Sequence, residues 1–204
     1  DWLVVESTYG NRSHAALDPE DALADVVNRA ASRGGSVLIP SFAVGRAQSL
    51  LYHLHRLKAD GRIPDIPIVL DSPMAINATD IFCRHVDDHR LTRAECVQVF
   101  GGVRYTRTVE ESKSLTANGF RMPMILISAS GMATGGRILH HLRHFAPDHR
   151  NAILFAGYQA GGTRGASMTG GARSVKIFGE YVPIRAEVDN LDMLSAHADA
   201  DEIM

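Results

Sequence analysis

Short apolar runs that alternate with segments of helical period limit the fold of this chain more than any other feature. The apolar runs have the length of strands, and they occupy residues 2–6, 36–40, 66–70, 124–128 and 152–155. The segments between them have helical spacing, over residues 19–33, 44–58, 74–86 and 137–145. This order is typical of parallel strands joined by crossover helices. The sequence therefore predicts one α/β domain with a mostly parallel sheet flanked by helices.

Two stretches are less regular. Residues 87–122 are polar, and within them we expect a strand near 103–109 and a short helix near 110–117. Residues 175–178 and 184–188 follow a glycine-rich loop, and we expect them to form an antiparallel pair or two edge strands.

The composition is that of a globular protein, with 204 residues of which 45% are hydrophobic and 22% charged. No apolar run approaches the roughly 18 residues of a membrane span, so we expect a cytoplasmic protein with no membrane partner. Its two cysteines, Cys83 and Cys96, are too few for a disulfide framework. The net charge of −2 creates no global positive field. Any binding of nucleic acid must therefore be local.

Two polar clusters lie at opposite ends of the chain, around Glu6 and around His197. Each lies at the mouth of a strand-like apolar run. A carboxylate and an imidazole form a proton-donating dyad if the fold brings them together. A buried salt bridge, or two unrelated surface residues, is the commoner explanation for such a pair.

The segment 128–137 is rich in glycine and lies between a predicted strand and a predicted helix, where backbone N–H groups favour an anion. It matches neither a Walker A loop nor a dinucleotide fingerprint. Tight packing between strand and helix explains such a loop about as often as phosphate binding does. Arg137 in the first helical turn favours phosphate slightly. The candidate phosphate contacts in this segment are Ser128, Ser130, Gly131, Gly135, Gly136 and Arg137.

The ten histidines do not indicate a complete metal site. His140 and His144 have a separation of four, which can hold zinc on a helix, but a third ligand is absent. A solvated helix surface is the simpler explanation for them. The chain also has no Gly-x-Ser-x-Gly segment, and its cysteines have no histidine partner in a recognisable motif, so a serine or cysteine hydrolase is not indicated.

Several segments together resemble the β-CASP branch of the metallo-β-lactamase superfamily. Val-Glu-Ser-Thr-Tyr-Gly at 5–10 and Ser-Ala-His-Ala-Asp at 195–199 resemble two of its sequence motifs, and the segments 39–48, 71–75, 128–141 and 157–163 match further blocks in the same order. The resemblance covers nearly the whole chain. It is strongest to RNA-processing nucleases of bacteria and archaea that are akin to the endonuclease subunit of the eukaryotic pre-mRNA cleavage complex.

The resemblance implies a β-CASP domain over 11–188, with short pieces of a metallo-β-lactamase domain at 1–10 and 189–204. It also implies that RNA passes between the two domains over a site with two zinc ions. His197 would then be the general acid that protonates the departing sugar oxygen, because an alkoxide is a poor leaving group. Glu6 would hydrogen-bond to His197 and keep it charged. Ser195, Arg46 and the 128–137 loop would contact phosphate.

The His-x-His-x-Asp-His metal motif of the family is absent from these 204 residues. We therefore expect that the chain is cut from a larger protein, that the zinc ions bind in that parent and none in this fragment, and that the fragment cleaves nothing. The expected partners are RNA and the rest of the metallo-β-lactamase domain, and a homodimer stays open. A non-catalytic RNA-binding scaffold and a DNA-directed nuclease of the same family are the alternatives.

Overall fold

A parallel sheet of six strands forms the centre of the computed structural model, which describes residues 2–11, 13, 18–117, 123–194 and 197–204. Its strands are ordered β3-β2-β4-β1-β5-β8, and every described pairing between them is parallel. The predicted α/β class is confirmed. The strands are β1 (Val37–Pro40), β2 (Ile68–Asp71), β3 (Arg104–Tyr105), β4 (Ile125–Ser128), β5 (Ala152–Ala156) and β8 (Glu187–Leu191).

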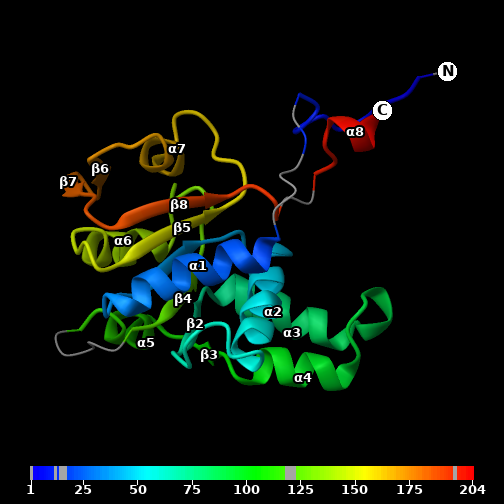
Figure 1. Ribbon diagram of the computed structural model, residues 1–204, viewed down its shortest axis with the longest axis horizontal. Helices are drawn as coiled ribbons and strands as arrows, with labels where there is room; N and C mark the ends of the chain where they lie inside the picture. Colours follow the sequence, from blue (N-terminus) through cyan, green and yellow to red (C-terminus); the bar gives the residue numbers. More distant parts are fainter. Residues whose placement is uncertain (1, 12, 14–17, 118–122, 195–196) are drawn as a thin grey trace.

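Helices cover both faces of this sheet (Figure 1). One face packs against α1 (Pro19–Ser32), α2 (Arg46–Ala59), α3 (Pro73–Arg84) and α4 (Arg93–Gly101). The other face packs against α6 (Ile138–Phe145), α7 (Arg164–Thr169) and the hairpin of β6 (Ser174–Ile177) and β7 (Glu180–Pro183). The remaining elements are the short helices α5 (Val109–Ser114) and α8 (Ala200–Ile203) and a 3₁₀ turn over Val86–Asp88.

The central strands are apolar except for Asp71 and Ser128, the last residues of β2 and β4, because both faces of the sheet are buried. Within β1, Val37 and Ile39 face the core on the α1–α4 side, and Leu38 faces the core on the α6 side. The same alternation in β2, β4 and β5 divides the apolar residues into two cores. Continuous apolar runs of four or five residues therefore predicted these strands correctly.

Helix starts follow from capping side chains. Asp18 accepts a hydrogen bond from the Glu20 backbone N–H at 2.8 Å, and Pro19 occupies the first turn of α1. Ser72 caps α3 in the same way ahead of Pro73. Helix α4 was not predicted, although Thr92 and Glu95 form a capping box at its start. That capping box could have predicted the start of α4 from the sequence.

The predicted strand at 2–6 is wrong for the described residues. Trp2, Leu3 and Val4 are 100%, 88% and 94% exposed, and no described strand pairs with them. The only described pairing near this end is an isolated parallel bridge between Tyr9 and Asp199. An apolar run becomes a strand only when a neighbouring strand satisfies its backbone groups, and none of the described residues does so here.

Of the two arrangements expected for the C-terminal strands, the antiparallel pair is wrong, whereas β8 does lie at an edge of the main sheet. Residues 174–177 pair with β7, not with 184–188, because Phe178 and Gly179 both adopt positive φ angles of 50° and 89° and close a two-residue hairpin. Strand β8 instead joins the main sheet beside β5. The domain boundary expected after residue 188 thus falls inside a strand. The strand expected at 103–109 is confined to β3.

The carboxyl ends of the six parallel strands lie along one edge of the sheet. In open α/β sheets, ligands bind in crevices outside this edge, where loops from neighbouring strands meet. The loops that follow β1, β4 and β5 begin here. The fold therefore predicts a binding site at this edge of the sheet.

Candidate functional site at the joined chain ends

Glu6 and His197 lie in contact although 191 positions separate them. The Oε2 atom of Glu6 is 3.3 Å from Nδ1 of His197. The same carboxylate accepts hydrogen bonds from the Thr8 backbone N–H at 3.1 Å and from the Ala198 backbone N–H at 2.9 Å. The bond from Thr8 is the largest cause of the lowered pKa of Glu6, which is therefore ionised at neutral pH. The structure brings the two predicted residues together.

Tyr9 and Asp199 fix the two chain ends beside each other. Both side chains are buried, at 2% and 7% exposure, and their backbones form the parallel bridge. Asp199 also caps α8 by accepting hydrogen bonds from the Asp201 and Glu202 backbone N–H groups, each at 3.0 Å. The Tyr9 ring lies 6.0 Å from the His197 ring. Figure 1 shows both ends on the same side of the molecule, next to α8.

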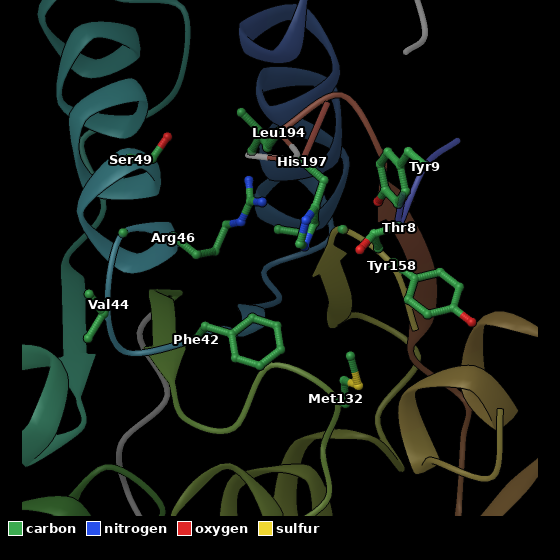
Figure 2. A pocket seen from close by; sticks show the side chains of 13 residues that line it. Thr8, Tyr9, Phe42, Val44, Arg46, Ser49, Met132, Tyr158, Leu194 and His197 are labelled. Carbon is green, nitrogen blue, oxygen red and sulfur yellow. The ribbon is translucent and has the colours of Figure 1, made fainter. Parts of the chain in front are cut away.

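His197 faces a cleft of about 600 Å³ (Figure 2). Phe42, Met132 and Tyr158 come from the loops that follow β1, β4 and β5, so the cleft opens at the carboxyl edge of the sheet. Thr8, Tyr9 and Leu194 close it on the side of the joined chain ends. A cleft of this size accommodates a nucleotide-sized ligand.

Arg46, the first residue of α2, extends into this cleft opposite His197 (Figure 2). Burial lowers the pKa of Arg46, while the coulombic contribution of Tyr9 opposes that shift. The group stays a cation at neutral pH, because guanidinium groups lose their proton only far above that range. Its Nε atom is buried and has no hydrogen-bond partner among the described residues. An unsatisfied cationic donor beside an open cleft is suited to an anionic oxygen.

Close packing explains two of the three glycines of the 128–137 loop, whereas a Cβ atom on Gly135 would meet nothing within 4 Å. A Cβ atom on Gly131 would lie 2.9 Å from the Phe42 ring, and one on Gly136 would lie 2.4 Å from the Ala129 carbonyl oxygen. Ser130 Oγ accepts hydrogen bonds from the backbone N–H groups of Thr134 at 3.1 Å and Gly135 at 3.3 Å. Two of the N–H groups expected to bind phosphate therefore already have a partner within the loop.

Two further predicted phosphate contacts, Ser128 and Arg137, belong to a buried network around Asp71. Ser128 Oγ donates to the Asp71 carbonyl oxygen at 2.8 Å, and an Arg137 guanidinium nitrogen lies 2.7 Å from the Asp71 carboxylate. Nε2 of His141 lies 2.5 Å from the other carboxylate oxygen. The structure thus places both predicted residues outside the lining of the His197 cleft.

Asp71 is fully buried yet ionised. Burial alone would raise its pKa, but hydrogen bonds from His141, Ser112, Thr106 and Arg137 outweigh burial and hold the pKa well below its usual range. The sequence carried a signal for this network. Asp71 directly follows an apolar strand, and His141 falls at helical spacing among Ile138, Leu142 and Phe145, on the buried side of α6.

The remaining predictions concern Ser195 and metal ions. Ser195 lies outside the described residues. Among the described residues, no group of three or more His, Cys, Asp or Glu side chains could hold a metal ion. The same part of the chain contains no helix with the length and apolar character needed to cross a membrane.

Comparisons with known proteins agree with the motifs. A family model described as "Beta-Casp domain" matches residues 47–168. Ribonuclease TTHA0252 of Thermus thermophilus is 39% identical over the whole chain, which covers 48% of that protein. Transcription termination factor FttA of Pyrococcus abyssi is 36% identical over 99% of the chain and 33% of its own length, and an RNase J-like protein of Methanocaldococcus jannaschii is 31% identical over the whole chain and 48% of its own length. The chain spans half or less of these relatives.

The Asp71 network generates a stability prediction. Asp71→Asn should lower the free energy of unfolding at pH 7 by about 3 kcal/mol, because it leaves buried partners without their charge. Because the folded pKa is depressed, this contribution is present above the unfolded pKa of about 3.9 and is lost as the pH falls through the lower folded value. The difference in free energy of unfolding between the unaltered chain and Asp71→Asn should therefore become smaller below about pH 4. Urea unfolding of both proteins at several pH values measures this difference.

Asp80→Asn is the matched control for this substitution. It makes the same chemical change at an ion pair with Arg107 in which the side chains are 52% and 58% exposed. Its effect should stay within about 0.5 kcal/mol. Equal stability losses for the two variants would contradict the assignment of a buried, ionised Asp71.

Proposed function

The chain belongs to the β-CASP family, and from that premise we propose that it is the RNA-binding and proton-donating part of a metal-dependent ribonuclease with a metallo-β-lactamase fold. The observation that carries this proposal is the contact of Glu6 with His197 at the rim of a cleft that also holds Arg46. An imidazole and a partly buried guanidinium in one cleft, with a carboxylate that positions the imidazole, are groups that assist phosphodiester hydrolysis beside a nucleophile.

His197 acts as the general acid. Its Nδ1 atom faces Glu6, so the proton delivered to the departing sugar oxygen is carried on Nε2. Without that proton the leaving group would be an alkoxide, which leaves slowly. A positioned general acid typically contributes 10²- to 10⁴-fold to the rate.

Glu6 acts as the positioning residue for His197. Its carboxylate is held by two backbone N–H groups, one from each chain end, so its direction is fixed before RNA binds. The negative charge stabilises the imidazolium form of His197 and orients the ring. Gln at this position would keep a hydrogen-bond acceptor but remove the charge.

Arg46 contacts the phosphate of the bound RNA. The chain has a net charge of −2, so the attraction for RNA must come from cations at the cleft itself. The RNA-facing surface combines this guanidinium with Phe42 and Tyr158, whose rings offer stacking surfaces for bases.

The two zinc ions implied by the family have no ligand cluster among the described residues. The described residues therefore do not fit a metal pair, and we propose that the zinc ligands lie in other parts of the whole protein. In this layout residues 1–10 and the segment after β8 belong to the metallo-β-lactamase domain, and the chain by itself does not cleave RNA.

The relatives named transcription termination factors favour a second candidate function. In that case the same cleft holds RNA without turnover, and the whole protein acts as an RNA-binding factor. His197 would then matter little beyond its contact with Glu6.

His197→Ala in the whole protein distinguishes the two functions. We expect single-turnover RNA cleavage to slow by 10²- to 10⁴-fold, because the departing oxygen loses its proton donor. Zinc content, measured by elemental analysis, should stay unchanged. His149→Ala, at a side chain that is 80% exposed, is the control and should cleave at the normal rate. An unchanged rate or a loss of zinc in His197→Ala would contradict the proposal.

Arg46→Met tests the phosphate contact. The substitution keeps an unbranched apolar side chain and removes one cation, so RNA should bind more weakly and with a shallower salt dependence. The slope of log K against log salt should fall by roughly 0.7 for a single strand. Fluorescence anisotropy with the whole protein at several salt concentrations measures this slope. Arg93→Met on the exposed surface of α4 is the control. An equal change of the salt slope in both variants would contradict a specific contact between Arg46 and phosphate.

A further inference from the structure

A second cavity, of about 460 Å³, lies between α5 and α6 and shares no lining residue with the His197 cleft. We propose that it is a binding site for a phosphate ester of about nucleotide size. This inference does not depend on the proposed nuclease function. The lining side chains that carry the argument are Lys113, Arg137, His141 and Arg143.

The charge of the cavity lining has one sign. Lys113, Arg137 and Arg143 line it, and none of its described lining residues is acidic. The carboxylates nearest to the arginines are Asp71, 2.7 Å from Arg137, and Glu180, 2.6 Å from Arg143. Lys113 makes no ion pair or side-chain hydrogen bond with the described residues. One positive charge therefore remains uncompensated before any histidine is protonated.

His141 is the second, independent observation. Its ring lines the cavity but is only 1% exposed, and its Nε2 atom is held by the ionised Asp71 carboxylate. Its Nδ1 atom is buried and has no hydrogen-bond partner among the described residues. A buried polar atom without a partner costs about 1–3 kcal/mol. A ligand in the cavity that places a hydrogen-bonding group against Nδ1 would remove this cost.

Of the two arginines, Arg143 has the partner that is more easily exchanged, because Arg137 is held by the buried Asp71. The Arg143–Glu180 pair is exposed, with side chains 52% and 64% accessible, and such pairs contribute little net free energy. Arg143 can therefore turn to a phosphate at small cost, and a phosphate accepts two parallel hydrogen bonds from a guanidinium group. The hydroxyls of Ser112 and Thr116 already donate to the Asp71 carboxylate and to the Lys113 carbonyl oxygen, so the cations are the groups that would bind the phosphate.

A phosphate ester fits this lining better than a metal ion or an apolar ligand. The histidines do not form a metal-binding group, as noted above for the described residues. Val109 and the ring of Phe178, which lies 4.6 Å from the His140 ring, provide apolar surface near the cations for the organic part of an ester. The volume lies within the range of small-molecule sites.

The test is calorimetric titration of the chain with inorganic phosphate and with a nucleoside monophosphate. We expect saturable binding with a Kd of about 1 mM or tighter, and tighter binding of the nucleotide than of phosphate alone. The Lys113→Met and Arg143→Met double variant should weaken nucleotide binding at least tenfold while its urea unfolding curve stays unchanged. Lys176→Met on β6 is the matched control and should bind normally.

Imidazole ¹⁵N spectra locate the bound phosphate. Titration should shift the resonances of His140, His141 and His144 and leave that of His197 in place. A single-stranded RNA that competes would identify the ester as part of RNA, whereas failure to compete would identify a free nucleotide, and both outcomes support the site. Absence of saturable binding, or binding that Arg46→Met abolishes and the double variant leaves intact, would overturn the proposal.

Discussion

The candidate site depends on the contacts of the Glu6 carboxylate. It accepts hydrogen bonds from Thr8 at one end of the chain and Ala198 at the other, and it also contacts the His197 ring. Because a carboxylate has several acceptor positions, one side chain can satisfy all three partners. The bridge between Tyr9 and Asp199 continues the same junction through the backbone. Contacts between two segments that are far apart in the sequence therefore hold the site residues in place.

The sheet supplies the second half of the site. Parallel strands end at one edge, and the loops after β1, β4 and β5 bring Phe42, Met132 and Tyr158 to the cleft beside His197. On the α6 face, Asp71 draws Ser112, Arg137 and His141 onto the end of β2. The two polar clusters thus use neighbouring strand ends but open into separate cavities.

Local sequence patterns predicted the central strands and α1 to α3, since apolar runs and capping residues act over a few positions. They failed where a distant partner decides the outcome. The run at 2–6 is apolar but has no neighbouring strand in the described chain, and β8 pairs with β5 and not with the nearer β6. The pairing of Arg137 with a buried Asp71, 66 positions away, was not predicted. The expected contact of Glu6 with His197 came from the family resemblance, not from periodicity.

The most direct test of the account is RNA cleavage by the whole protein when sulfur replaces the bridging oxygen of the departing sugar. A thiolate leaves readily without a proton, so a missing general acid matters little for this substrate. The account predicts that His197→Ala cleaves the sulfur-substituted RNA at nearly the rate of the unaltered protein, while it loses 10²- to 10⁴-fold on ordinary RNA. An equal loss on both substrates would contradict the assignment of His197 as the proton donor.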